Sequence, residues 1–328
     1  MSTLEDVLVR WLALELPEDT AITLSGLRRT SLGFSRENWV FDLEWSRPDE
    51  HGRDPLIARR DPLGSVLVTD RQTEFDVLRA LEGTSVPAPR ARWIDADGRR
   101  LERPTIVMVR EVGECDWFVL NGGRPLPARV GIARQLCDLL ASIHHVDWRG
   151  IGLGEVFVDP GGDASLAELD HWEEVLRTHQ LEPLPELELV FGWLRRRAPK
   201  AGATVLVHGD FKPGNTLLRG DEVAVMLDWE LAHLGDPLED LGWVTNPLRR
   251  REHIIPGAWE VDDLVGHYEQ ITGTAVDRQA LRWWNVFSNL KLSVIVLTGL
   301  AAYVDGRYDR SYQLPCSLIS LMFDLMEV

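Results

Sequence analysis

Residues 207–215, VHGDFKPGN, carry the strongest single indication of how this chain folds. They overlap a short apolar run, VLV at 205–207, which is typical of a buried strand. Two more strand-like runs follow, TLL at 216–218 and VAVML at 223–227, with the turn sequence RGDE between them. A tight hairpin is therefore expected here, and it should bring Asp228 back beside the 207–215 loop.

The polar residues of this segment are of the types that phosphoryl transfer requires. One carboxylate must orient and deprotonate the acceptor hydroxyl, and oxygen ligands must hold Mg²⁺ against the nucleotide phosphates. Asp210 is the expected base, and Asn215 and Asp228 are the expected Mg²⁺ ligands because both offer hard oxygen donors. Lys212 follows the base by two residues and is placed to neutralise charge on the transferred group, so Asp210 and Lys212 are the predicted catalytic residues.

The N-terminal third of the chain indicates a sheet with one inserted helix. Alternating, aromatic-rich residues predict a strand over 39–45, and the polar stretch 46–54 predicts a turn before a second strand at 55–60. Apolar residues at helical spacing predict helices over about 3–16 and over 73–81. The remaining strands are expected at 22–27, 91–94 and 105–109.

The rest of the chain is mainly helical in character. A continuous apolar stripe predicts a strong helix over 129–144. Further helices are expected at 166–179, at 187–197 and throughout the chain from about residue 261. The change of character divides the sequence into an N-terminal lobe, residues 1–108, and a C-terminal lobe, residues 109–328. The predicted fold class is therefore α+β, with a β-rich first lobe and a mainly α-helical second lobe.

Composition and charge argue against several classes of function. The chain has 328 residues, 45% hydrophobic and 27% charged, which is ordinary for a globular protein, and its formal net charge is −17. Such a surface repels nucleic acid and anionic membranes, so neither is expected as a partner. Three widely spaced cysteines form no metal motif or disulfide framework, which favours a reducing, cytoplasmic setting.

Neither a signal peptide nor a membrane span is expected. The N-terminus is acidic and amphipathic and lacks the basic flank and apolar core of a signal peptide. The most apolar later stretch, 292–304, is bracketed by Lys291 and Asp305 and is too short to cross a bilayer. We expect a buried helix there.

The central motif resembles the catalytic loop of the protein-kinase-like superfamily, His-x-Asp-x-x-x-x-Asn. Because Gly209 follows the histidine, it is more similar to the aminoglycoside phosphotransferase and choline-kinase-like branch than to protein kinases. The run DWE at 228–230 stands where protein kinases carry Asp-Phe-Gly. Residues 235–241, GDPLEDL, are similar to a Gly-Asp-Pro-x-x-Asp-Leu run of that family, which implies that Asp240 helps to hold the catalytic loop.

The resemblance also assigns roles in the N-terminal lobe. In the family a glycine-containing loop covers the phosphates, and residues 32–38 occupy that place, so Gly33 and Ser35 are implied phosphate contacts. Arg59 stands at the position of the third-strand lysine that contacts the α- and β-phosphates, and Glu74 is its implied partner on the next helix. Arginine can bridge a phosphate and a carboxylate but is not interchangeable with lysine.

The segment MVREVG at 108–113 resembles the hinge whose backbone binds the adenine edge. Met108 and Glu111 are accordingly implied nucleotide contacts. The resemblance as a whole implies the two-lobed protein-kinase-like fold, with ATP as the nucleotide (GTP being the alternative) and Mg²⁺ as the metal. It implies transfer of the γ-phosphoryl group to a hydroxyl of a small molecule, either an aminoglycoside-like antibiotic or a metabolite.

Several residues have two open interpretations. His208 is expected to pack and hydrogen-bond the loop, with a catalytic role as the alternative. Glu230 is either a second metal contact or a surface acid. The tryptophans Trp229, Trp283 and Trp284 are candidates for an acceptor pocket, with core packing as the alternative.

Two rival functions stay open. A catalytically weak nucleotide-binding regulatory module is favoured only by Arg59 and by the single glycine of the phosphate loop. A protein kinase is disfavoured by Gly209 and by the short stretch between Asp228 and Asp240, which leaves little room for an activation segment. The sequence does not indicate the oligomeric state.

Overall fold

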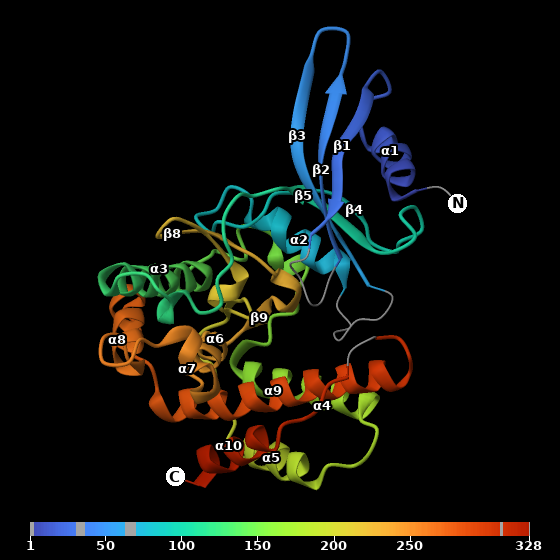
Figure 1. Ribbon diagram of the computed structural model, residues 1–328. Helices are drawn as coiled ribbons and strands as arrows, with labels where there is room; N and C mark the ends of the chain where they lie inside the picture. Colours follow the sequence, from blue (N-terminus) through green and yellow to red (C-terminus); the bar gives the residue numbers. More distant parts are fainter. Residues whose placement is uncertain (1–2, 31–36, 63–69, 309–310, 328) are drawn as a thin grey trace.

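The computed structural model describes residues 3–30, 37–62, 70–308 and 311–327. A five-stranded antiparallel sheet forms the N-terminal part, with strand order β1-β2-β3-β5-β4. It lies at the top of Figure 1, above the helices of the C-terminal part. Its strands are β1 (Ala21–Arg29), β2 (Glu37–Ser46), β3 (His51–Arg60), β4 (Ala91–Asp95) and β5 (Thr105–Val109).

Two helices accompany this sheet. Helix α1 (Leu4–Glu15) begins with a capping box, in which Thr3 Oγ1 accepts from the backbone N–H of Asp6 and the Asp6 carboxylate accepts from that of Thr3. The apolar face of α1 packs with the inner residues of β1, β2 and β3 in one core cluster. Helix α2 (Arg71–Leu81) is inserted between β3 and β4 and faces the C-terminal lobe.

The hairpin of β2 and β3 is longer than the sequence predicts. We expected the turn to run to residue 54, but Ser46 already pairs with His51 and the strand continues from there. The polar residues at the start of β3 pair across the hairpin, since Arg53 binds Asp42 and Asp54 accepts from the indole of Trp45. These cross-strand contacts keep a hydrophilic segment in the sheet.

The C-terminal part is mainly helical, with two short two-stranded sheets. Its helices are α3 (Leu126–His144), α4 (Ala164–His179), α5 (Pro185–Arg196), α6 (Leu238–Val244), α7 (Arg250–His253), α8 (Val261–Thr272), α9 (Arg278–Val304) and α10 (Cys316–Glu327). Strands β6 (Val205–Val207) and β9 (His233–Gly235) pair with each other, and β7 (Thr216–Arg219) pairs with β8 (Glu222–Met226).

The chain from residue 261 is mainly helical, as expected, and it is divided into α8, α9 and α10. Helix α8 ends at Thr272 and is followed by Gly273, whose backbone is left-handed with φ of 68°, a conformation that glycine adopts without strain. Helix α9 ends at Val304, and the described residues 311–315 before α10 are not helical. The chain needs these breaks to pack α9 against α4, α6 and α10 (Figure 1).

Helix α9 is the central helix of the C-terminal lobe. It is the one helix in the described part of the chain long and apolar enough to cross a membrane, but 72% of that apolar window is buried inside the fold. Lys291 and Asn289 lie buried near its middle. The sequence interpretation took Lys291 as a charge at the end of an apolar run; it is instead inside the core.

The largest core cluster joins the two lobes next to the central 207–215 motif. It contains Val77 and Leu78 of α2, Met108 of β5, Phe211 within the central motif, and Trp229 directly after Asp228. Helix α2 contacts the 3-10 helix η5 (Trp229–Leu231), which follows Asp228 directly. Residues far apart in sequence therefore meet where the motif residues lie.

Candidate active site

The 207–215 loop brings three of the predicted residues into direct contact. It leaves β6, passes through the 3-10 helix η4 (Pro213–Asn215) and enters β7. Lys212 Nζ lies 2.5 Å from Asp210 Oδ2. Asn215 Nδ2 donates to the same oxygen and to the backbone carbonyl of Asp210, both at 3.0 Å. Because the amide nitrogen of Asn215 is committed to Asp210, its Oδ1 is the atom that remains for a cation.

Asp240 of α6 holds the start of this loop. Its two carboxylate oxygens accept from the backbone N–H groups of His208 and Gly209 at 2.8 and 2.9 Å. His144 Nε2 lies 3.2 Å from the same carboxylate, and Tyr268 contacts the other ring nitrogen of His144. Burial by itself would raise the pKa of Asp240, but these hydrogen bonds and charges lower it to about 2. Asp240 is therefore a permanent anion that fixes two peptide groups.

His208 connects the two halves of the motif. Its Nδ1 accepts from the backbone N–H of Asp210, so its Nε2 carries the proton and donates to the carbonyl of Leu227 at 2.9 Å. Burial lowers the pKa of His208, which is consistent with a neutral ring. Because Leu227 immediately precedes Asp228, His208 fixes the distance between the predicted base and the predicted metal ligand.

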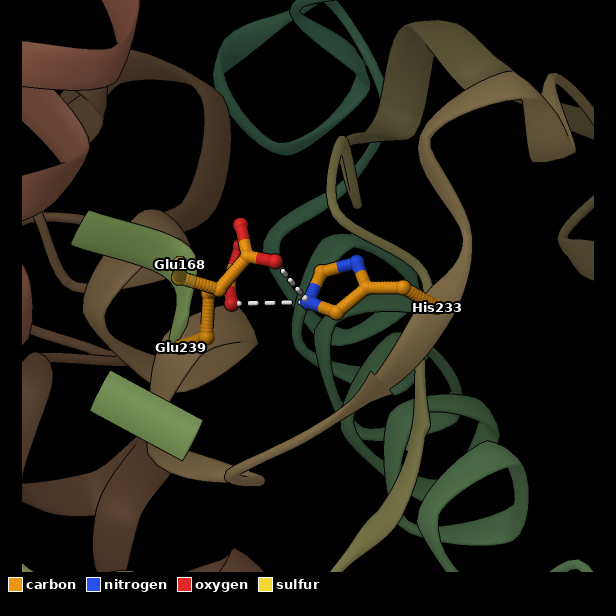
Figure 2. A group of neighbouring side chains, drawn as sticks. All are labelled: Glu168, His233 and Glu239. Carbon is orange, nitrogen blue, oxygen red and sulfur yellow. Dashed lines mark hydrogen bonds and ion pairs between the residues drawn. The ribbon is translucent and has the colours of Figure 1, made fainter. Parts of the chain in front are cut away.

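Lys291 supports the loop from below. Its Nζ donates to the carbonyl of Gly209 and pairs with Glu239, both at 2.9 Å. Glu239 also binds His233, which lies 3.4 Å from Glu168 (Figure 2). Burial by itself would lower the pKa of His233, but the two glutamates raise it to about 10.

Glu168, His233 and Glu239 offer three ligand atoms within 4.8 Å of one another, close enough for a metal ion. Side-chain cations already neutralise the two glutamates, because His233 bridges both carboxylates in Figure 2 and Lys291 pairs with that of Glu239. The cluster is thus an ion-pair network that braces β9, α4, α6 and α9 under the loop.

Asp228 stands at a turn with a left-handed backbone, φ 65° and ψ 60°. A non-glycine residue in that region is uncommon and is often found at functional sites. Its Oδ1 lies 2.6 Å from Arg59, whose guanidinium also binds Glu74 at 2.8 Å. Arg59 on β3 therefore bridges helix α2 and the predicted metal ligand.

Arg71, at the first position of α2, extends this network. It pairs with Glu74, with Asp61 at 2.9 Å and with Glu230 at 3.1 Å. The two alternatives for Glu230 were a metal contact and a surface acid; its carboxylate is nearly buried and bound to Arg71. Helix α2 is thereby held to the segment that follows Asp228.

A sequence model described as "Phosphotransferase enzyme family" matches residues 28–284, well over half of the chain, and includes the groups described above except Lys291. The chain belongs to this phosphotransferase family. The match spans both the sheet with Arg59 and the loop with Asp210, so the two halves of the site fall within one family domain.

Solved structures of the family share the fold. A protein from Ralstonia eutropha, a candidate aminoglycoside phosphotransferase, superimposes with a TM-score of 0.73 at 22% identity and covers 98% of both chains. The macrolide 2'-phosphotransferase of Brachybacterium faecium gives 0.55 at 17% identity, covering 98% of this chain and 97% of that one. The protein has the protein-kinase-like, two-lobed α+β fold of these phosphotransferases, as the sequence predicts.

Curated relatives come from longer proteins. Acyl-CoA dehydrogenase family member 10 of Mus musculus is 28% identical over 227 residues, 67% of this chain but 21% of that protein. Acyl-CoA dehydrogenase family member 11 of Rattus norvegicus is 28% identical over 276 residues, 79% of this chain and 34% of that protein. The chain thus matches about a fifth to a third of the length of these relatives.

The structure brings six of the predicted site residues together and leaves the others apart or outside the described residues. Asp210, Lys212, Asn215, Asp228, Arg59 and Glu74 form two adjoining groups linked through His208 and Leu227. Gly33 and Ser35 lie outside the described residues. Met108 is a buried residue of β5, and the side chain of Glu111 pairs with Arg219 of β7 at 3.0 Å.

The tryptophans proposed for an acceptor pocket belong to the core instead. Trp229, Trp283 and Trp284 are all fully buried, and Trp283 stacks on Phe287 within α9. The same reasoning from sequence missed Arg71, Lys291 and His233. Of these three, only Lys291 could have been found from the sequence. A lysine beside a long apolar run either ends the buried part of a helix or is itself buried and paired with an acidic group.

Proposed function

We propose that the chain is an ATP- and Mg²⁺-dependent phosphotransferase that moves the γ-phosphoryl group to a hydroxyl of a small molecule. The observation that supports this is the Asp210 carboxylate held between Lys212 and Asn215, with Asp228 tied to it through His208. Asp210 would accept the hydroxyl proton, and Lys212 would balance the charge of the transferred group.

The donor set fits Mg²⁺. Asn215 Oδ1 and the Asp228 carboxylate are hard oxygen ligands, and Asp228 is already pointed at a cation, Arg59. Bound Mg²⁺ would supply charge neutralisation for the nucleotide phosphates. Arg59, fixed by Glu74, would contact the phosphates, and residues 108–113 would bind the adenine edge. Solved structures of the same fold include a ternary complex with streptomycin and ATP, with a TM-score of 0.57.

The test is calorimetric titration of ATP, and separately GTP, with Mg²⁺ into the purified chain and into Asp228→Ala. Binding that needs Mg²⁺ and is weakened in the variant is the expected result. Asp19→Ala, in an exposed segment, is the control and should bind as the parent chain does. Absence of nucleotide binding in the parent chain would contradict the proposal.

Turnover separates this enzyme from a regulatory module. Asp210→Ala should bind Mg·ATP normally and lose ADP formation in the presence of an acceptor. Equal ADP formation by Asp210→Ala and the parent chain would exclude Asp210 as the base. Incubation with generic protein substrates tests the protein-kinase alternative, and no labelled protein is expected.

The relatives suggest two acceptor classes for the first screen. The solved structures include a gentamicin complex and a macrolide 2'-phosphotransferase, and the curated relatives are acyl-CoA dehydrogenase family members. A screen should therefore include hydroxylated antibiotics and hydroxylated acyl compounds side by side, because a shared fold does not decide the substrate.

A further inference from the structure

Two neighbouring aromatic residues stand exposed beside the catalytic loop, each with a cation on its ring. Trp117 is 41% exposed and Phe118 is 45% exposed. Lys212 Nζ lies 4.7 Å from the centroid of the Trp117 ring, and the guanidinium carbon of Arg251 lies 5.2 Å from that of Phe118. Each ring therefore offers an apolar face with a cation against it.

The surface is continuous with the loop that carries Asp210. A Cβ added to Gly214 would lie 2.7 Å from the indole of Trp117, so this ring lies directly on the loop. Asn121 Nδ2 donates to the carbonyls of Arg251 and Ile254, both at 2.8 Å. Those bonds tie the 3-10 helix η1 (Val119–Asn121) to α7, and they hold the aromatic pair and Arg251 in one place.

Charge distinguishes Arg251 from its two neighbours. Arg249 pairs with Glu252 at 3.1 Å, and Arg250 pairs with Glu260 at 2.9 Å. Arg251 is exposed, and among the described residues no carboxylate pairs with it. In a chain with a formal net charge of −17, such a guanidinium beside the proposed reaction centre would attract an oxyanion and repel a polycation.

Resting on the proposed phosphotransferase activity, we propose that the acceptor is an amphipathic hydroxylated anion. Its carboxylate or phosphate group pairs with Arg251, and its apolar part lies on Trp117 and Phe118. Its hydroxyl reaches Asp210. The bond between that oxygen and the γ-phosphorus forms as the β–γ bridging P–O bond breaks, ADP leaves, and the hydroxyl proton passes to Asp210.

The test uses three probes titrated calorimetrically with Mg·AMP-PNP present: 3-hydroxyoctanoate, octyl phosphate and streptomycin. At least one of the two anions should bind and streptomycin should not. The anion that binds shows whether the site takes a carboxylate or a phosphate. In Arg251→Glu the dissociation constant of that anion should rise about tenfold or more, because a charge-assisted contact is replaced by repulsion.

Arg250→Glu is the matched control, since it makes the same charge change one residue away on the same helix, and anion binding should be unchanged. The inference is overturned by streptomycin binding, by anion binding that Arg251→Glu leaves intact, or by binding of neither anion. Binding of Mg·AMP-PNP is measured first, so its absence counts against the phosphotransferase proposal separately. If Mg·AMP-PNP does not bind, the anion titrations are run without nucleotide. The same outcomes then support or overturn the proposed anion site.

Discussion

At Gly209 the backbone φ is +79°, and an added Cβ would lie 2.5 Å from the carbonyl oxygen of Leu231. The residue before the proposed base must therefore be glycine for two separate reasons, conformation and contact. Its N–H and carbonyl are both taken, by Asp240 and Lys291. The backbone beside Asp210 is thus fixed by groups that take no part in chemistry.

Gly209→Ala and Gly152→Ala separate those two reasons. Gly152 also has a left-handed backbone, φ +84°, but nothing lies within 4 Å of its added Cβ. Gly152→Ala should cost about 1–2 kcal/mol of unfolding free energy and leave ADP formation unchanged. Gly209→Ala should cost more and suppress ADP formation, measured by denaturant titration and a coupled assay. Equal stability losses in the two variants would show that the Leu231 contact is unimportant.

Lys291 provides a second prediction at this scale. Its side chain is 2% exposed and pairs with the buried Glu239, so Lys291→Met leaves a carboxylate short of a partner. The expected loss of unfolding free energy is about 3–5 kcal/mol. Lys200→Met breaks the pair with Asp163, in which Lys200 is 75% exposed, and should cost about 0–1 kcal/mol. A small loss at Lys291, as at Lys200, would mean that Glu239 is satisfied without it.

Helix α2 positions two charged side chains, Arg71 and Glu74, beside the proposed site. Arg71 lies at its first position and Glu74 one turn further, and together with Arg59 they connect β3, α2 and η5. Asp70 caps the helix by accepting from the backbone N–H groups of Gln72 and Thr73. The cap therefore supports the position of Glu74 as well as the helix itself.

Removing helix caps tests this element. Asp70→Ala should cost about 1 kcal/mol of unfolding free energy, and so should Asp277→Ala, which removes the cap of α9. Only Asp70→Ala should also weaken Mg·ATP binding, since α2 holds Glu74 against Arg59. If calorimetry finds the same nucleotide affinity in both variants, the position of α2 does not affect nucleotide binding.

Over the whole molecule, buried charge links stability to pH. The pKa of His233 rises from 6.5 to about 10 on folding, because the nearby glutamates outweigh burial. A raised pKa stabilises the folded state fully below 6.5, and this stabilisation is lost as the pH rises toward 10. Stability should therefore decline over that range through His233.

His233→Gln removes this dependence on pH. Melting temperatures measured from pH 6.5 to 10 should fall less steeply in the variant than in the parent chain. His51→Gln, on an exposed residue of β3, is the control and should follow the parent curve. A parent-like slope in His233→Gln would show that the ring is not charged in the folded protein.

The sequence predicts well what local spacing governs. Asp210, Lys212 and Asn215 lie in one short loop, so their meeting follows from backbone geometry alone. The sequence predicts poorly where a strand begins within polar residues. Strand β3 begins at His51, inside the stretch expected to be a turn, because cross-strand pairing outweighs the turn-like composition.

By itself, then, the sequence determined the α+β fold and family, because the loop, the hairpin and the alternation of the sheet are short-range patterns. Tertiary structure alone decided which cations hold the site. Arg71 reaches Glu230 across 159 residues and Lys291 reaches Gly209 across 82, and the pKa of His233 is raised because α4 and α6 each bring a glutamate to it. These ion pairs depend on how the helices pack around buried charges. The spacing of residues along the chain therefore does not predict them.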